Sequence, residues 1–399
     1  MIFSEIAGHK DLAEMLKGMV QKGRMPHAML FAEQSGCGAL PLVLATVQFM
    51  FCRARKALAG GDEKWLLKGL FGDNPETAAP TEDSCEICSS CIKIRNLSHP
   101  DFHFVFPINT TQIVEKGKKA SIDAYYEIFR DLVKQNPYFS EQDLYNAMEL
   151  DNKMGLIGVS EASWLINRLS FSAYEGGDKV VLIMFPERMN LEAANKLLKS
   201  IEEPTEDTYF FLITNAPGKI IQTIRSRCRL IEVPPIENEA LAKALEAKYK
   251  MDGEKAAMWA SCAQGSFGRA IELIEESEAE KEDFEDLSSL IRLALDKDLP
   301  GLVNAGADLA RRGKEAQKNF CRSALKLLRQ IYVIKLGKED IAYLNPNQKE
   351  EIEELSKKVK ADSFEKLYEI FNDTIECIER NVNAKFIFSD LCNALYQNI

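Results

Sequence analysis

Apolar and polar residues follow two different patterns along this chain, and the pattern changes near residue 235. Before that point, short runs that are apolar throughout alternate with segments in which apolar residues recur every three or four positions. Continuous apolar runs are typical of strands buried on both faces, and the longer period is typical of amphipathic helices. The first part of the chain is therefore predicted to form a parallel sheet flanked by helices.

The expected strands cover residues 28–31, 102–106, 179–184, 209–214 and 228–233. The expected helices cover residues 9–22, 40–52, 159–169 and 190–202, with a shorter helical segment at 220–224. Two stretches, residues 53–84 and 108–153, interrupt this alternation and are interpreted as insertions, the second with two helices of its own.

The strand pattern ends at Pro234 and the proline that follows it. Residues 239–277 predict three short helices, and amphipathic helices follow to the last residue. The acidic run at 275–285 is interpreted as a solvated linker or helix face. We therefore expect three domains: an α/β domain at 1–235, a small helical domain at 236–278 and an all-α domain at 279–399.

Composition narrows the possible functions. The 399 residues are 46% hydrophobic and 28% charged, which is ordinary for a globular protein that is not embedded in a membrane. The longest apolar run is too short to span a bilayer and the first residues carry no basic signal region, so we expect a cytoplasmic protein. The net charge of −11 argues against broad electrostatic binding of nucleic acid, so any DNA contact is expected to be local or made through partners.

The sequence FAEQSGCGALP joins the first strand to a helix, which is the context of the phosphate-binding pattern GxxxxGK[ST]. Two glycines of such a loop remain, but the residues that would contact phosphate and metal are missing. Alanine cannot pair with a phosphate, leucine cannot ligate Mg²⁺, and a glutamate repels an anion. We therefore expect no nucleotide at this degenerate loop, whose key positions are Glu33, Gly36, Gly38, Ala39 and Leu40.

A second nucleotide-site feature is also missing. The strand KVVLIM should end in the Asp that binds Mg²⁺ and the Glu that polarises water, but Met184 and Phe185 stand there. Glu187 lies further along the chain, and the acidic pair that begins at Glu202 is interpreted as a helix end before Pro204 rather than as a catalytic pair. The chain is therefore not expected to hydrolyse ATP by itself.

Three closely spaced thiols suggest a metal site. Cys85, Cys88 and Cys91 lie within seven residues, and a structural Zn²⁺ site requires four tetrahedral ligands. Cys52 is the expected fourth ligand, and His99 is the alternative. Four thiolates would close the site and leave no activated water, so the metal is expected to be structural. The other cysteines are interpreted as small buried hydrophobic residues.

The segment TIRSRC lies between the short helical segment and the last strand. An arginine in such a loop is ordinarily solvated or paired with a carboxylate. A guanidinium at a subunit edge can instead stabilise charge on the γ-phosphate of a neighbouring subunit. The local sequence leaves both interpretations open.

Taken together, these segments resemble the delta-prime subunits of the bacterial DNA polymerase III clamp loader, which are members of the AAA+ superfamily. The resemblance spans residues from about 1 to 275. It is carried by HAMLFAEQSGCGAL, by the cysteine knuckle with SHPDF, by GDKVVLIMFPERMNLEAANKLLKSIEEPTEDTYFFLITN, by IIQTIRSRCRLIEVPP and by GSFGRAIEL. It implies an AAA+ α/β domain, a small helical lid domain and an all-α C-terminal collar domain that holds a subunit ring together.

The resemblance also implies roles for individual residues. Ser226, Arg227 and Cys228 correspond to the SRC motif, so Arg227 is expected to be an arginine finger that acts in trans. Arg269 corresponds to the sensor-2 arginine of active subunits, and we expect a structural role for it here. The family's structural zinc ligands correspond to Cys52, Cys85, Cys88 and Cys91.

The function implied by the resemblance is that of a non-hydrolysing component of the DNA polymerase III holoenzyme, which helps to load the sliding clamp on primed DNA. The expected partners are the motor subunits, the delta subunit, the sliding clamp and, through the assembled complex, DNA. ATP is expected only on neighbouring subunits. Two alternatives remain: an ATP-hydrolysing motor subunit of the same complex, and a zinc-stabilised adaptor unconnected with replication.

Overall fold

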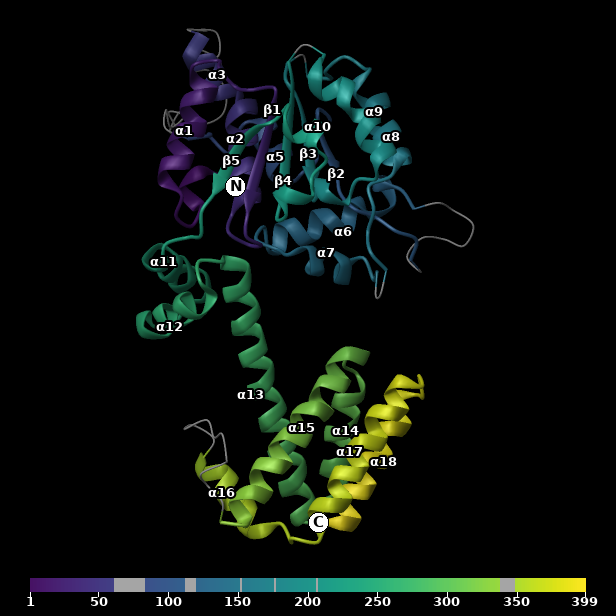
Figure 1. The fold of residues 1–399 in the computed structure, drawn as a ribbon. Coiled ribbons are helices and arrows are strands. Elements are labelled where there is room, and N and C mark those ends of the chain that lie inside the picture. Colours follow the sequence, from purple (N-terminus) through teal and green to yellow (C-terminus); the bar gives the residue numbers. More distant parts are fainter. Residues whose placement is uncertain (61–82, 112–119, 151–152, 176, 206, 338–348) are drawn as a thin grey trace, which may run out of the picture. The chain divides into compact units, whose positions relative to one another are not determined.

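The computed structural model describes residues 1–60, 83–111, 120–150, 153–175, 177–205, 207–337 and 349–399. The chain divides into two compact units, Met1–Leu273 and Ile274–Ile399, whose elements are labelled in Figure 1. This division does not separate the expected α/β domain from the expected lid domain, so the three-domain organisation remains a prediction. Most of the first expected insertion, residues 61–82, lies outside the described residues.

A parallel sheet of five strands forms the centre of the first unit, as expected from the sequence (Figure 1). The strand order is β2-β3-β4-β1-β5, and every pairing is parallel. The expected strands are all present and differ from the prediction only at their ends. Their bounds are β1 (Ala28–Glu33), β2 (Phe102–Val105), β3 (Lys179–Met184), β4 (Thr208–Thr214) and β5 (Arg229–Val233).

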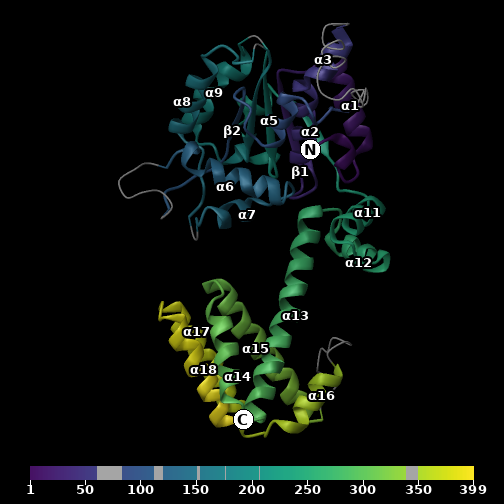
Figure 2. The same cartoon turned by 180° about the vertical axis from the view of Figure 1, so that it is seen from behind.

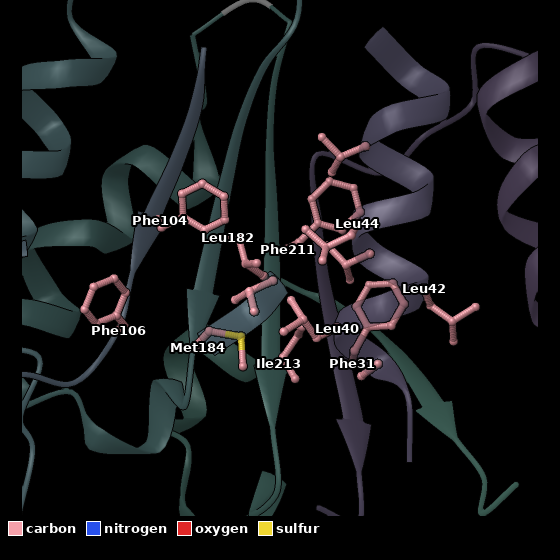
Figure 3. Close-up of a cluster of buried hydrophobic side chains, with 14 of the residues drawn as sticks. Phe31, Leu40, Leu42, Leu44, Phe104, Phe106, Leu182, Met184, Phe211 and Ile213 are labelled. Carbon is pink, nitrogen blue, oxygen red and sulfur yellow. The ribbon is translucent and has the colours of Figure 1, made fainter. Parts of the chain in front are cut away.

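Helices on both faces cover the sheet, which explains why its strands are apolar throughout. Side chains alternate between the two faces of a strand, and both sets are buried: Phe31 and Phe211 lie on one face, and Leu30 and Phe210 on the other. Figure 3 shows Phe31, Phe211 and Leu40 gathered between the sheet and the helix that follows β1. The helices of this unit up to β5 are α1 (Lys10–Gln21), α2 (Ala39–Phe51), α3 (Arg53–Gly60), α5 (Ser89–Arg95), α6 (Ile122–Gln135), α7 (Glu141–Ala147), α8 (Val159–Leu169), α9 (Leu191–Glu202) and α10 (Gln222–Arg225), with short 3₁₀ turns η1 (Phe3–Glu5), η2 (Pro186–Arg188) and η3 (Pro217–Lys219).

The second expected insertion contains α6 and α7, in agreement with the two helices predicted there. α6 begins after Ser121, whose side chain accepts a hydrogen bond from the backbone N–H of Ala124. Its apolar face contributes Phe129, whose ring stacks on Phe106 with the ring centroids 4.4 Å apart. This insertion is therefore part of the main core rather than a loose appendage.

The prediction of three short helices after β5 is wrong for the third helix. α11 (Asn238–Tyr249) and α12 (Gly253–Ala263) are short, but α13 (Phe267–Leu295) runs for 29 residues through the acidic run. The side chains at 275–282 are all exposed, so the acidic run is a solvated stretch of a helix that crosses the boundary between the two units. Glutamate, lysine and alanine favour helices, and no glycine or proline interrupts this stretch.

The second unit is all-α, as expected (Figures 1 and 2). Its core contains Phe320, Leu328 and Phe371, among other buried apolar residues. α14 and α18 pack closely, because a Cβ at Gly306 would lie only 2.6 Å from the Cys392 sulfur. Across the described part of the chain, no helix is both long and apolar enough to cross a membrane. Besides the end of α13, the helices are α14 (Leu299–Ala310), α15 (Lys314–Lys335), α16 (Lys349–Lys358), α17 (Ser363–Glu379) and α18 (Ala384–Asn398).

Candidate functional site

The degenerate loop connects β1 to α2 at the carboxyl end of the sheet. Gly36 has φ of 76° and Gly38 has φ of 111°, in the left-handed region that other residues rarely adopt. The two glycines therefore still form the tight turn between strand and helix. Ala39 and Leu40, which stand where a nucleotide loop has Lys and Ser/Thr, are buried in the first turn of α2.

The carboxylate of Glu33 lies at the N-terminus of α2, where a phosphate would lie in an intact loop. Its Oε2 accepts a hydrogen bond of 2.8 Å from the backbone N–H of Ala39. Burial raises the pKa of Glu33 to about 7, and hydrogen bonds from the backbone N–H groups of Ala39, Gly38 and Cys37 act in the opposite direction. The sequence indicated a repelling charge at this position. The structure adds that this side chain takes up the loop N–H groups itself.

The other side of the loop is covered by the start of α13. The Ser266 hydroxyl donates a hydrogen bond of 2.7 Å to the carbonyl oxygen of Ser35. The backbone N–H of Phe267 donates to the carbonyl oxygen of Gly36 at 2.9 Å. The Phe267 ring also stacks on Tyr138, with the ring centroids 4.5 Å apart. The carbonyl groups of the loop are thus bonded to the chain's own residues.

The acid nearest the end of β3 is bound to the neighbouring strand. Met184 and Phe185 are buried, as their place at the end of a central strand requires. The Glu187 carboxylate accepts hydrogen bonds from the Thr214 hydroxyl at 2.8 Å and from the backbone N–H of Asn215 at 3.3 Å. This carboxylate therefore stabilises the end of β4.

A cavity of about 500 Å³ opens beside the loop, between the carboxyl ends of β1, β3 and β4. Its one arginine, Arg188, forms two hydrogen bonds to Glu141, of 2.6 Å and 2.9 Å. The Tyr145 hydroxyl donates to the same carboxylate at 2.5 Å. The guanidinium is thereby neutralised within the chain. The cavity is lined by Ser35, Ser140, Glu141, Gln142, Tyr145, Lys153, Met154, Arg188 and Asn215.

The sulfur atoms of the four predicted cysteines converge in space. The ligand atoms of Cys52, Cys85, Cys88 and Cys91 all lie within 4.8 Å of one another, and none of the four is in a disulfide. The Cys85 and Cys91 sulfurs are 3.9 Å apart. A tetrahedral site with metal–sulfur bonds of about 2.3 Å requires sulfur–sulfur distances of about 3.8 Å. The cluster therefore has a donor set and a size that suit a structural metal ion such as Zn²⁺.

Cys52, and not His99, completes this cluster. His99 is buried, and its Nδ1 accepts a hydrogen bond of 3.2 Å from the backbone N–H of Asp101. Its Nε2 lies 3.3 Å from a carboxylate oxygen of Glu175. His99 is not one of the residues whose ligand atoms gather in the cluster. Cys52 follows the last residue of α2, and its sulfur accepts a hydrogen bond of 3.4 Å from the backbone N–H of Cys85.

Glu175 joins the two chain segments that carry the cysteines, a role that the sequence did not indicate. Its Oε2 accepts hydrogen bonds from Arg53 at 2.6 Å and from the Ser90 hydroxyl at 3.1 Å, and its Oε1 pairs with Lys93. Burial alone would raise the pKa of Glu175, but the hydrogen bond from Lys93 and the charge of His99 lower it to about 2. Because Arg53 follows one cysteine and Ser90 precedes another, this carboxylate holds the cluster in shape.

The TIRSRC segment presents Arg227 at the surface, between α10 and β5. Its Nε donates to the carboxylate of Glu202, the last residue of α9. Its Nη1 donates to the carbonyl oxygen of Thr223 at 2.9 Å and lies 3.5 Å from the Ser226 hydroxyl. Within the described residues, the hydrogen bonds of this guanidinium leave from Nε and Nη1 and none leaves from Nη2. Cys228 is partly buried, and burial raises the pKa of its thiol to about 11.

Arg269 is directed toward its own helix. Its Nη1 donates a hydrogen bond of 2.8 Å to Glu272, one turn further along α13. Its backbone N–H donates to the Ser266 hydroxyl, which is also the group that contacts the loop. The expectation of a structural role for Arg269 remains a prediction.

Comparison with known proteins finds relatives of similar sequence. A family model described as "DNA polymerase III, delta subunit" matches residues 61–237. The delta-prime subunit of DNA polymerase III from Bacillus subtilis is 28% identical over 232 residues, which are 58% of this chain and 49% of the relative. The delta-prime subunit from Escherichia coli is 26% identical over 264 residues, which are 66% of this chain and 58% of the relative.

A shorter match has a higher identity. The delta-prime subunit from Pseudomonas aeruginosa is 42% identical over 84 residues, which are 21% of this chain and 26% of the relative. The chain thus spans about half the length, or less, of most of the curated relatives that it matches. These matches confirm its resemblance to the delta-prime subunits of DNA polymerase III.

The solved structures that the chain matches include a gamma subunit-related protein of DNA polymerase III from Thermotoga maritima. It has a TM-score of 0.33 and 13% identity, with 97% of this chain and 99% of that chain covered. The DNA clamp loader delta protein from Bacillus subtilis has a TM-score of 0.26 and 10% identity, with 77% of this chain and 98% of that chain covered.

Proposed function

We propose that this chain is a delta-prime-type subunit of a bacterial DNA polymerase III clamp loader, which helps to load the sliding clamp on primed DNA. In this role it hydrolyses no ATP itself and supplies Arg227 to the ATP site of an adjacent motor subunit. The observation that carries the proposal is a contrast within one unit. The chain's own loop is filled by Glu33, whereas the guanidinium of Arg227 is held at the surface and, among the described residues, makes no hydrogen bond from its Nη2.

The internal contacts of the loop support a subunit without its own ATPase activity. A nucleotide loop works by offering unpaired backbone N–H groups, a lysine and a metal-binding hydroxyl to the phosphates. Here the Ala39 N–H binds Glu33, and the lysine and hydroxyl are absent from the sequence. The Glu187 carboxylate is engaged by Thr214. The alternative of an ATP-hydrolysing motor subunit has no comparable support.

The surface position of Arg227 supports a role in trans. A guanidinium that faces outward can contact the γ-phosphate of a neighbouring subunit, and its planar fork suits bidentate binding of phosphate oxygens. Arginine fingers supplied in this way raise turnover by roughly 10³–10⁵ in other phosphoryl-transfer systems. A zinc-stabilised adaptor, the other alternative, gains nothing from an arginine held in this manner.

The proposed cofactor of the chain is one structural Zn²⁺, held by Cys52, Cys85, Cys88 and Cys91. Four thiolates leave no open position for water or substrate, so the ion would stabilise the fold and take no part in catalysis. ATP would bind only on neighbouring subunits. The proposed partners are the motor subunits, the delta subunit, the sliding clamp and primed DNA in the assembled complex, in the cytoplasm.

The test is the ATPase activity of the reconstituted clamp loader with Arg227→Ala. The variant is expected to fold and assemble normally, while turnover at the composite site falls by at least about 10³-fold. Arg225→Ala is the matched control, because Arg225 is an exposed arginine in the same segment. Unchanged stimulation of the ATPase by clamp and primed DNA in the Arg227→Ala complex would refute the finger assignment.

A further inference from the structure

We infer that Glu202 is a positioning residue for the arginine finger, because its carboxylate accepts a hydrogen bond from Nε of Arg227 and, together with the Thr223 carbonyl on Nη1, fixes the plane of the guanidinium. The inference rests on the proposed function, since it concerns the same composite ATP site. The sequence suggested only that the acidic pair beginning at Glu202 ends a helix, and the inference gives this residue a functional role.

The contacts of Arg227 fix the orientation of its guanidinium. Nε donates to Glu202, and Nη1 donates to the carbonyl oxygen of Thr223 at 2.9 Å. A guanidinium is planar, so two fixed nitrogens determine where the third one points. Nη2 is that third nitrogen, and among the residues that the structure describes no hydrogen bond leaves from it. The group is therefore preorganised to donate to an acceptor outside the chain.

Both anchors of the guanidinium stand on elements that are tied to the sheet. Glu202 ends α9, whose Leu197 and Ile201 are fully buried against the sheet. Thr223 lies in α10, next to Ile224, which is 1% exposed. A group held between two packed helices keeps its position better than one on a free loop. The pair thus connects the finger to the core of the unit.

The exposure of the pair distinguishes positioning from stabilisation. The Arg227 side chain is 36% exposed and the Glu202 side chain 38% exposed. Exposed ion pairs contribute little to folding stability, because water solvates both charges when they separate. Loss of Glu202 should therefore leave the fold intact but free the long arginine side chain to sample other rotamers. Ordering such a side chain again at each turnover corresponds to a rate loss of about two- to tenfold.

The opposite interpretation makes a different prediction. If Glu202 restrained Arg227 away from the neighbouring nucleotide, removing the carboxylate would release the finger and raise turnover. The printed contacts favour positioning, because the bonds to Glu202 and Thr223 use Nε and Nη1 and leave the N–H groups of Nη2 for a phosphate. The sign of the change in turnover therefore decides between the two interpretations.

The experiment compares reconstituted clamp loaders that contain the Glu202→Ala, Glu202→Gln or Glu203→Gln chain, with ATPase measured over a range of ATP concentrations. Glu203 is the matched control, since it is the exposed acid next in sequence. Glu202→Ala is expected to lower kcat at the composite site about two- to tenfold, with KM and thermal stability unchanged. Glu202→Gln should recover part of the loss, because its amide oxygen can still accept from Nε. Glu203→Gln should behave as the unsubstituted chain.

Combining the substitutions separates the inference from the proposed function. If Glu202 acts through the finger, Glu202→Ala should have no further effect in a chain that already carries Arg227→Ala. An equal, additional loss in that background, or unchanged or raised kcat in Glu202→Ala alone, would overturn the inference while the finger assignment stands. No effect of Arg227→Ala itself would instead remove the proposed finger, and the positioning role with it.

Discussion

The carboxyl group of Glu33 should make the first unit less stable as the pH rises. In the folded chain its pKa is about 7, against an ordinary value of 4.5. Between these two values the folded state holds a proton that the unfolded state has released, so folding is favoured at low pH. The stabilisation is complete below about pH 4.5 and is lost as the pH rises through about 7. The replacement Glu33→Gln removes this dependence while its amide oxygen can still accept the Ala39 N–H.

The size of the effect follows from the shift in pKa. One pKa unit corresponds to about 1.4 kcal/mol, so a rise from 4.5 to about 7 amounts to at most about 3 kcal/mol. His9 has the opposite effect on the pH dependence of stability. Burial lowers its pKa below the ordinary value of 6.5, so the folded state becomes more stable as the pH rises toward that value. The Glu33→Gln chain and the original chain contain the same histidines. Their contribution therefore cancels when the substituted chain is compared with the original one.

The assay is urea unfolding at pH 5 and pH 8, followed by tryptophan fluorescence. All three tryptophans, Trp65, Trp164 and Trp259, precede residue 274, so the signal reports on the first unit. Glu33→Gln should match the original chain at pH 5 and exceed it by up to about 3 kcal/mol at pH 8. Glu14→Gln is the control, since the Glu14 side chain is 72% exposed. The same loss of stability between pH 5 and pH 8 in both chains would show that Glu33 does not titrate in this way.

Further predictions concern the cysteine cluster and the second unit. Cys88→Ser should abolish binding of the roughly one equivalent of zinc expected in anaerobically purified protein. Substitution of the exposed Cys262 by serine, or of the buried His99 by alanine, should leave the zinc in place. Metal analysis measures the zinc content, and original protein without zinc would contradict the proposed site. Gly306→Ala should destabilise the packing of α14 on α18 by about 1–3 kcal/mol, because its Cβ would lie 2.6 Å from the Cys392 sulfur. Hydrogen exchange of α14 would show this, with Gly313→Ala, which has open space around it, as the control.

The strands of this protein could be predicted well because the sheet is covered on both faces. Phe210 and Phe211 are neighbours in sequence and point to opposite faces, yet both are fully buried. Such a run has no polar positions, and this distinguishes it from the neighbouring helices, in which apolar and polar residues alternate every three or four positions. α13 was predicted less well, because its exposed middle has no apolar period to mark it as a helix. The hydrophobic pattern indicates which residues are packed against others, so it cannot identify a helix that is solvated on all sides.

The features of the candidate site also differ in how well the sequence predicts them. A missing residue can be identified from the sequence alone. Ala39 stands where a nucleotide loop has lysine, and Met184 stands where an ATPase has a metal-binding acid. Contacts between distant segments cannot be identified in this way: Glu202 and Arg227 are 25 positions apart and meet only because α9 and α10 pack together. The cysteine spacing indicated three ligands, while the choice between Cys52 and His99 required the fold.

The filled loop leads to a last prediction, about the isolated chain and ATP. The Ala39 N–H, which is the kind of group that an intact loop offers to a phosphate, is bonded to Glu33. The loop is also held in place by the hydrogen bond from the Phe267 N–H to the Gly36 carbonyl. A ligand that binds the folded state stabilises it by RT ln(1 + [L]/Kd), so 1 mM ATP would add about 2.7 kcal/mol at a Kd of about 10 μM. We expect no measurable shift in the unfolding midpoint of the tryptophan signal at that concentration, with or without Mg²⁺. A stabilisation of that size that Glu33→Gln left unchanged would mean that ATP binds without displacing this carboxylate, and would favour the motor-subunit alternative.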